Sequence, residues 1–196
     1  SHDLDEAMRI GDRIAIMKDG QVVQVGTPEE ILRRPADDYV RNFIRGVDAA
    51  AVFKAGDIAR KTQVEVSEAP TRGCRPALKR LQDQDRDWGY VVGLDHQYLG
   101  TVSGDSLRAA LHGHEGPLGL AHAFVPGIAP VPAATPIHEL IGLVAQISAP
   151  LPVVTDQGKL LGTISKNTLL KFLDRSTDAE GRPLPSTTPT AAEAAA

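Results

Sequence analysis

Three histidines are the first residues whose type and spacing suggest chemistry. His112 and His114 form an H-x-H pair, and His122 follows in the same segment. Imidazole nitrogens bind zinc, but no cysteine or carboxylate clearly completes a tetrahedral set around them. The one cysteine, Cys74, has no histidine near it in the sequence. We therefore interpret the histidine segment as a loop, and we predict no metal site.

Chemistry on nucleotide phosphates requires a different set of residues. No segment has the pattern G-x-x-x-x-G-K-[ST], in which backbone N–H groups and a lysine hold the β- and γ-phosphates. We therefore expect the 196-residue chain to bind ATP weakly or not at all by itself, and not to hydrolyse it.

Two short segments repeat a pattern of glycine, threonine and serine. The first is Gly100-Thr101-Val102-Ser103-Gly104-Asp105, the second is Gly162-Thr163-Ile164-Ser165, and a predicted helix follows each. A serine directly before a helix accepts a hydrogen bond from an N–H group of the first turn. Ser103 and Ser165 are therefore candidate N-caps.

The composition excludes several classes of protein. A chain of 196 residues with 42% hydrophobic residues is typical of one or two small globular domains. The net charge of −4 argues against general nucleic-acid binding. A single cysteine cannot form an internal disulfide, which favours a cytosolic protein. No apolar run approaches the roughly 18–20 residues that span a membrane. Because the sequence opens with Ser1 rather than Met, we expect further sequence upstream.

Residues 1–48 form the most strongly patterned block. The acidic first turn after His2 favours a helix, which we expect to end at Gly11. Asp19-Gly20 predicts a tight hairpin between strands at 13–17 and 21–25. Thr27, with Glu30 three residues later, predicts a capping box at the start of the next helix. A further helix is expected over 37–45.

The remaining sequence contains a duplication. Residues 90–111 match residues 152–173 at a constant offset of about 62. Each copy follows an amphipathic helix, predicted over 75–84 and 136–147, and the pattern predicts two βαββα units. One such unit has too little core alone, so we expect the two to pack together. We predict domains at 1–48, 49–114 and 115–175, and a disordered tail at 176–196 because of its polar, proline-rich composition.

The first block resembles the end of an ABC ATPase nucleotide-binding domain. The matching segments are Ser1–Ala7, Gly11–Gly20 and Gly26–Leu32. The resemblance implies that His2 is the switch histidine, which contacts the γ-phosphate of ATP in the complete protein. The glutamine loop, the LSGGQ-type signature and the acidic strand end that binds Mg²⁺ are absent from this sequence. ATP and Mg²⁺ are thus expected only in the intact parent.

The duplicated region resembles a tandem pair of CBS domains. Residues 35–48, which lead into it, are similar to the ATP-binding subunits of glycine betaine/proline betaine importers. The expected fold is thus α/β (α+β): the end of an ABC nucleotide-binding domain, a CBS pair and a tail. Many CBS pairs hold an adenine nucleotide or a cyclic dinucleotide. Ser103, Asp105 and Ser165 are the candidate binding residues, although Ser106 and Thr168 replace the aspartates of the family pattern.

The resemblance also implies partners and a regulatory signal. A membrane permease subunit and a second copy of the ATPase are expected, on the inner face of the plasma membrane. A basic cluster could dock on anionic lipid and report ionic strength, or it could be a solvated surface. The alternative function is a free-standing CBS regulatory protein without ATPase activity. The basic cluster consists of Arg60, Lys61, Arg72, Arg75, Lys79 and Arg80.

Overall fold

The computed structural model describes residues 2–68 and 73–174, and only the backbone of His2 and Asp3. The described residues divide into two compact units, residues 2–49 with 167–174 and residues 50–68 with 73–166. The predicted tail at 176–196 and Arg72 lie outside the described residues. The predicted domain boundaries stay predictions. Within the described part of the chain, no helix is both long and apolar enough to cross a bilayer.

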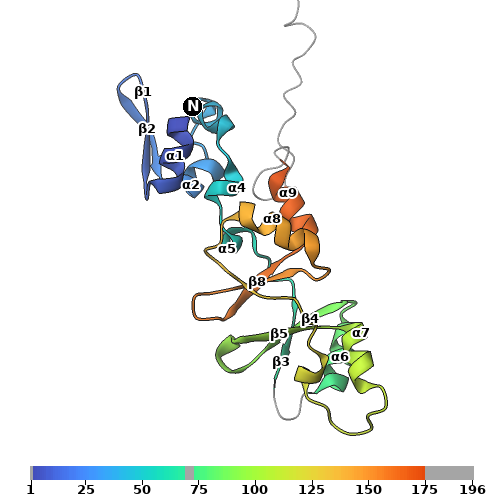
Figure 1. The fold of residues 1–196 in the computed structure, drawn as a ribbon. Coiled ribbons are helices and arrows are strands. Elements are labelled where there is room, and N and C mark those ends of the chain that lie inside the picture. The colour runs from blue at the N-terminus through green and yellow to red at the C-terminus, as the bar shows by residue number, and fades with distance from the viewer. Residues whose placement is uncertain (1, 69–72, 175–196) are drawn as a thin grey trace, which may run out of the picture. The chain divides into compact units, whose positions relative to one another are not determined.

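The first unit contains the predicted hairpin. Strands β1 (Ile14–Lys18) and β2 (Gln21–Gly26) pair antiparallel, with Lys18 opposite Gln21. Asp19 and Gly20 between them have φ of 51° and 78°. Positive φ at both central residues defines the type I′ turn, which an Asp-Gly pair favours. Figure 1 shows this hairpin beside α1 (His2–Ile10).

The helices of the first unit begin at the predicted caps. Thr27 precedes α2 (Pro28–Arg33); its Oγ1 accepts from Glu30 N at 3.2 Å, and a Glu30 carboxylate oxygen accepts from Thr27 N at 2.9 Å. This reciprocal pair is the predicted capping box. Asp37 caps α3 (Asp38–Phe43), which continues as the 3₁₀ turn η1 (Ile44–Gly46). The buried apolar residues of this unit include Met8, Ile16, Ile31 and Val40.

The second unit contains the duplicated βαββα pattern. In the first repeat, β3 (Val64–Ser67) is parallel to β4 (Trp88–Val92), which pairs antiparallel with β5 (Tyr98–Ser103). The second repeat has the same order in β6 (Val131–Pro132), β7 (Leu151–Val154) and β8 (Leu160–Ile164). The register shifts at corresponding residues, Val91/Val92 and Val153/Val154. The predicted duplication is confirmed.

Helices cover one face of the first repeat's sheet. Figure 1 shows α6 (Cys74–Asp83) and α7 (Gly104–Leu111) together beside β4 and β5. Leu81 and Leu107 from these helices are 1% and 0% exposed and pack with strand residues such as Val91 and Val102. The corresponding helices of the second repeat are α8 (Ile137–Gln146) and α9 (Lys166–Leu173). The buried side chains of α6, α7 and the strands thus build a core under one face of the first repeat's sheet.

The segment that precedes each repeat packs on the other repeat, so the two segments are exchanged. The helix α5 (Ala55–Ile58), which follows α4 (Ala49–Val52), packs on β6, β7 and β8 of the second repeat. Figure 1 shows α5 near β8. After it, Arg60 and Thr163 exchange two backbone hydrogen bonds of 2.9 and 3.0 Å. The segment before the second repeat contains η3 (Leu120–Ala123), which packs on β5 and α7 of the first repeat. After η3, Val125 N donates to Thr101 O at 2.8 Å.

Candidate functional site

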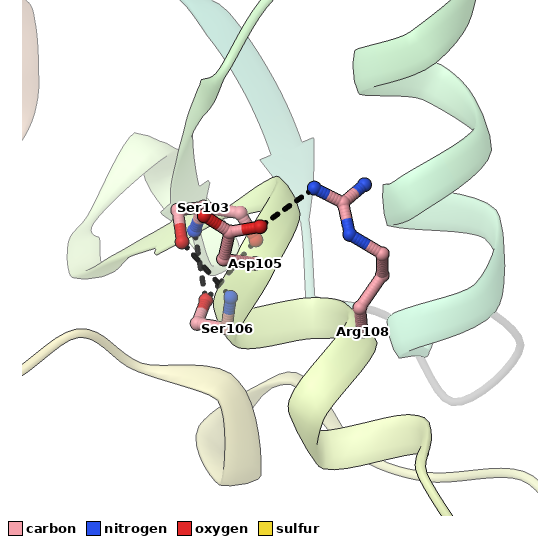
Figure 2. Close-up of polar contacts among 4 residues, drawn as sticks. All are labelled: Ser103, Asp105, Ser106 and Arg108. Carbon is pink, nitrogen blue, oxygen red and sulfur yellow. Dashed lines mark hydrogen bonds and ion pairs between the residues drawn. The ribbon is translucent and has the colours of Figure 1, made fainter.

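The junction of β5 and α7 holds the first copy of the glycine–threonine–serine pattern. Ser103 is the N-cap of α7, and its Oγ accepts from Ser106 N at 2.9 Å. Ser106 Oγ in turn accepts from Ser103 N at 2.8 Å and donates to Ser103 O at 3.1 Å (Figure 2). Ser106, which replaces the family's aspartate, thus completes a capping box. The predicted capping role of Ser103 is confirmed.

Asp105 lies on the surface of the same helix. Its carboxylate accepts from Arg108 Nη2 at 2.7 Å, one turn along α7 (Figure 2). The Asp105 side chain is 93% exposed and that of Arg108 is 56% exposed. An exposed ion pair at this spacing contributes only a few tenths of a kcal/mol. The arrangement therefore gives Asp105 a surface role in the structure, and its role in nucleotide binding stays a prediction.

The substitution Ser103→Ala tests whether the N-cap of α7 contributes more to stability than the exposed ion pair of Asp105. We expect this substitution to lower the free energy of unfolding by about 1 kcal/mol, because α7 loses an N-cap. Asp105→Ala, two residues away, should change it by less than about 0.5 kcal/mol, because the lost ion pair is exposed. Urea unfolding followed by circular dichroism measures both values. Equal losses in the two variants would contradict the assignment of Ser103 as the stabilising cap.

The glycine of each pattern copy permits a close approach of the exchanged segments. A Cβ on Gly162 would lie 2.8 Å from Arg60 O, and a Cβ on Gly100 would lie 2.9 Å from the Phe124 ring. Real Cβ atoms do not approach other atoms so closely, so a larger side chain forces the exchanged segment away. This function of the glycines was not predicted from the sequence. Their occurrence at corresponding positions in both copies was the available signal.

The two repeats also contact each other directly. Tyr90 Oη donates to Pro150 O at 2.7 Å, and Gln97 Nε2 donates to Gln157 O at 2.7 Å. Tyr90 packs with Val92 and with Leu160 of the second repeat. The repeats therefore do pack together, as their small size predicts.

The other predicted site residues lie in separate places. Ser165 is half-buried directly before α9. His2 is the first residue of α1, and its proposed role is untested. Arg60 and Lys61 belong to the segment paired with β8, whereas Arg75, Lys79 and Arg80 lie exposed on α6. The described members of the basic cluster thus belong to two structural elements.

Residues 112–119, between α7 and η3, form a loop that is held by polar contacts. Arg75 Nη2 donates to His114 O at 2.6 Å, and Cys74 Sγ donates to Gly119 O at 3.3 Å. Burial raises the pKa of the Cys74 thiol, although its backbone hydrogen bond partly opposes the shift. A raised pKa keeps the thiol neutral and unreactive. Among the described residues, no group of three or more His, Cys, Asp or Glu side chains could hold a metal ion.

Comparison with known proteins first defines the fold of the repeats. A family model described as "CBS domain" matches residues 124–175. A CBS domain pair/ACT domain protein from Thermotoga maritima aligns with TM-score 0.52 and 20% identity, over 62% of this chain and 96% of its own. CBSX2, a CBS-pair protein from Arabidopsis thaliana, aligns in its complex with AMP with TM-score 0.50 and 19% identity, over 62% and 96%. The repeats therefore have the CBS-pair fold, within the mixed α/β architecture that the sequence predicts.

Curated relatives then define the family. The glycine betaine/proline betaine transport system ATP-binding protein ProV of Salmonella typhimurium is 52% identical over 176 residues, which are 89% of this chain and 43% of that protein. The glycine betaine transport ATP-binding protein OpuAA of Bacillus subtilis is 35% identical over 88% of this chain and 40% of its own length. The predicted resemblance to the ATP-binding subunits of betaine ABC importers with CBS domains is confirmed. The chain spans less than half the length of these relatives.

Proposed function

We propose that this chain supplies the last part of the ATPase domain and the regulatory CBS pair of an importer for glycine betaine and proline-type osmoprotectants. The supporting observation is the 52% identity to ProV over 176 residues. A match of that length must include residues of the first unit as well as the CBS pair. A free-standing CBS regulator would have no use for an ATPase segment, so the identity favours the importer subunit.

The proposed division of labour follows from the residues present. ATP and Mg²⁺ would bind mainly to parts of the subunit that this sequence lacks, because it has no glycine-rich phosphate loop. His2 would act as the switch histidine beside the γ-phosphate. A neutral imidazole can donate a hydrogen bond to a phosphate oxygen without adding negative charge. The partners would be a membrane permease and a second ATP-binding subunit, at the inner face of the plasma membrane.

Reconstitution tests the proposed activity. The complete subunit, purified with its permease and its binding protein, is placed in liposomes that contain ATP. We expect uptake of labelled glycine betaine that requires ATP and stops with a non-hydrolysable analogue. The isolated 196-residue chain serves as the control and should show no ATPase activity. A complete gene product without any nucleotide hydrolysis would instead support the free-standing regulator.

The signal read by the CBS pair is proposed to be ionic strength or a nucleotide. Titration calorimetry with AMP, ATP and cyclic dinucleotides tests the second signal directly. The first signal would act through the basic residues exposed on α6, because salt at about 0.1 M screens charges over roughly 10 Å. Docking of this surface on anionic lipid would then weaken as cytoplasmic salt rises.

Lys79→Glu tests the proposed lipid-docking surface. Each basic residue at an anionic surface contributes about 1 kcal/mol, so charge reversal should weaken binding to phosphatidylserine vesicles about fivefold or more at low salt. Lys54→Glu is the matched control, since Lys54 is exposed but lies outside the basic cluster. Vesicle co-sedimentation at increasing salt measures the affinity. Equal losses in both variants, or binding that does not respond to salt, would count against docking through α6.

A further inference from the structure

Helix α1 has few contacts that fix its position. An isolated helix of nine residues is marginal in water, so its place must come from tertiary contacts. Of its described side chains, residues 4–10, only Met8 is fully buried, at 2% exposed. Ile10, at its end, is 76% exposed. The position of His2, the first residue of α1, therefore depends on the few residues that hold this helix.

Asp5 provides a polar contact on the packed side of α1. Asp5 and Met8 are one helical turn apart, so they lie on one face of the helix, and Asp5 is half-buried. Its Oδ1 accepts a hydrogen bond from Asp48 N at 3.4 Å. The two residues are 43 positions apart and belong to the same compact unit. The distance is at the long limit for a hydrogen bond, so the bond opens at little cost.

Asp48 lies where the chain enters the CBS pair. Helix α4 begins at the next residue, and its residues Ala50 and Val52 are buried. The chain then reaches Phe53, whose carbonyl oxygen accepts from Ile137 N at 3.0 Å. Ile137 is the first residue of α8 in the second repeat. The amide that α1 binds is thus joined through α4 to a backbone hydrogen bond of a CBS helix.

We propose that Asp5 is a positioning residue that couples the switch histidine to the CBS pair through its bond to Asp48. This rests on the proposed function, in which His2 is the switch histidine. When the CBS pair changes state, movement at the start of α8 reaches Asp48 through Phe53 and α4. The bond to Asp5 then shifts or releases α1, and with it His2. Coupling between two sites is reciprocal, so a change in α1 also changes α8.

Hydrogen exchange in the 196-residue chain tests the coupling without ATP. We expect Asp5→Ala to speed exchange of the Asp48 amide about twofold or more, because its acceptor is lost. The Ile137 amide should exchange faster as well, although it lies in the second repeat. Two-dimensional NMR measures both rates. Thr163 N, which donates to Arg60 O, is the internal reference and should not change.

Two variants separate the hydrogen bond from general loosening of α1. Asp5→Asn keeps a side-chain oxygen as acceptor and should restore most of the protection at Asp48. Glu6→Ala, at the exposed neighbouring position, should leave both rates as in the wild-type protein. An unchanged Asp48 amide in Asp5→Ala would overturn the proposal, because the bond would then not hold α1. A faster Asp48 amide with an unchanged Ile137 amide would also overturn it, since the change would not reach the CBS pair.

Kinetics of the complete subunit with its permease test the link to His2. We expect Asp5→Ala to lower kcat for ATP hydrolysis about threefold or more and to leave KM for ATP nearly unchanged, because only the transition-state contact of His2 is displaced. Asp5→Asn should recover most of kcat. In a His2→Ala subunit, Asp5→Ala should have no further effect, since it acts through the missing ring. An unchanged kcat, or equal losses in both backgrounds, would overturn the proposal.

The outcomes also distinguish this coupling from the importer role. If the complete wild-type subunit hydrolyses no ATP, the importer role fails, and the exchange rates alone decide whether α1 and the CBS pair are coupled. If it hydrolyses ATP and the Asp5 variants behave as the wild-type protein does, the coupling fails and the importer role stands.

Discussion

Gly162→Ala is expected to lower the free energy of unfolding of the second unit by roughly 2–3 kcal/mol. A Cβ at this position would lie 2.8 Å from Arg60 O and 3.3 Å from the Ala59 Cβ. The opposing atoms are mainly backbone, so they cannot move aside as a flexible side chain would. Movement of the exchanged segment would break the two hydrogen bonds between Arg60 and Thr163. Urea unfolding of the purified chain measures the loss.

Gly142→Ala is the matched control for this prediction. Gly142 lies in the exposed interior of α8, and a Cβ there meets nothing within 4 Å. Alanine has a higher helix propensity than glycine, so this variant should gain about 0.5–1 kcal/mol. Opposite signs in the two variants are therefore expected. A neutral Gly162→Ala would show that the exchanged segment does not depend on the close approach.

His2→Ala is expected to reduce ATP hydrolysis by the complete subunit by roughly 10²-fold or more, because loss of one donor to a transition-state oxygen has an effect of that size. The experiment requires the full polypeptide with its permease, assayed for phosphate release at saturating ATP. The expected effect is on kcat, and ATP binding should change much less. The prediction follows from the family resemblance of residues 1–7 and from the proposed role as a switch histidine.

His122→Ala is the control for the histidine variant. His122 is exposed in η3, and its ring Nδ1 lies 3.3 Å from Gly119 O. We expect this variant to retain normal hydrolysis. An active His2→Ala subunit would remove the switch assignment. An equally inactive His122→Ala subunit would point to a general loss of folding, which a thermal melt would reveal.

Local features of the sequence predicted most of the first unit. The I′ turn at Asp19-Gly20 and the capping box of Thr27 and Glu30 depend on residues only one to three positions apart. The helix expected over 37–45 is shorter than predicted, since it continues as a 3₁₀ turn from Ile44. Phe43, on this helix, is 47% exposed and stacks on Tyr39 with ring centroids 6.1 Å apart.

The candidate site was only partly predictable. Ser103 is the expected N-cap because a serine before a helix has a local physical use. The pairing of Asp105 with Arg108 is also local, at three residues' separation. The aromatic contact between the repeats was missed. Tyr90 and Pro150 are 60 residues apart, and nothing near either residue in the sequence indicates the other.

The sequence by itself determined the hairpin, the caps, the duplication and the family, because each is encoded by residue types at short or constant spacing. Only the tertiary structure decided which repeat each connecting segment joins. Arg60 pairs with Thr163, and Val125 pairs with Thr101, so each segment adds to the sheet of the other repeat. Backbone N–H and C=O groups are common to nearly all residues, so the only trace of these long-range pairings in the sequence is a glycine at corresponding positions of the two copies, Gly100 and Gly162. Only the folded chain shows that Gly162 lies against the backbone of Arg60, where the Arg60–Thr163 pairing forms.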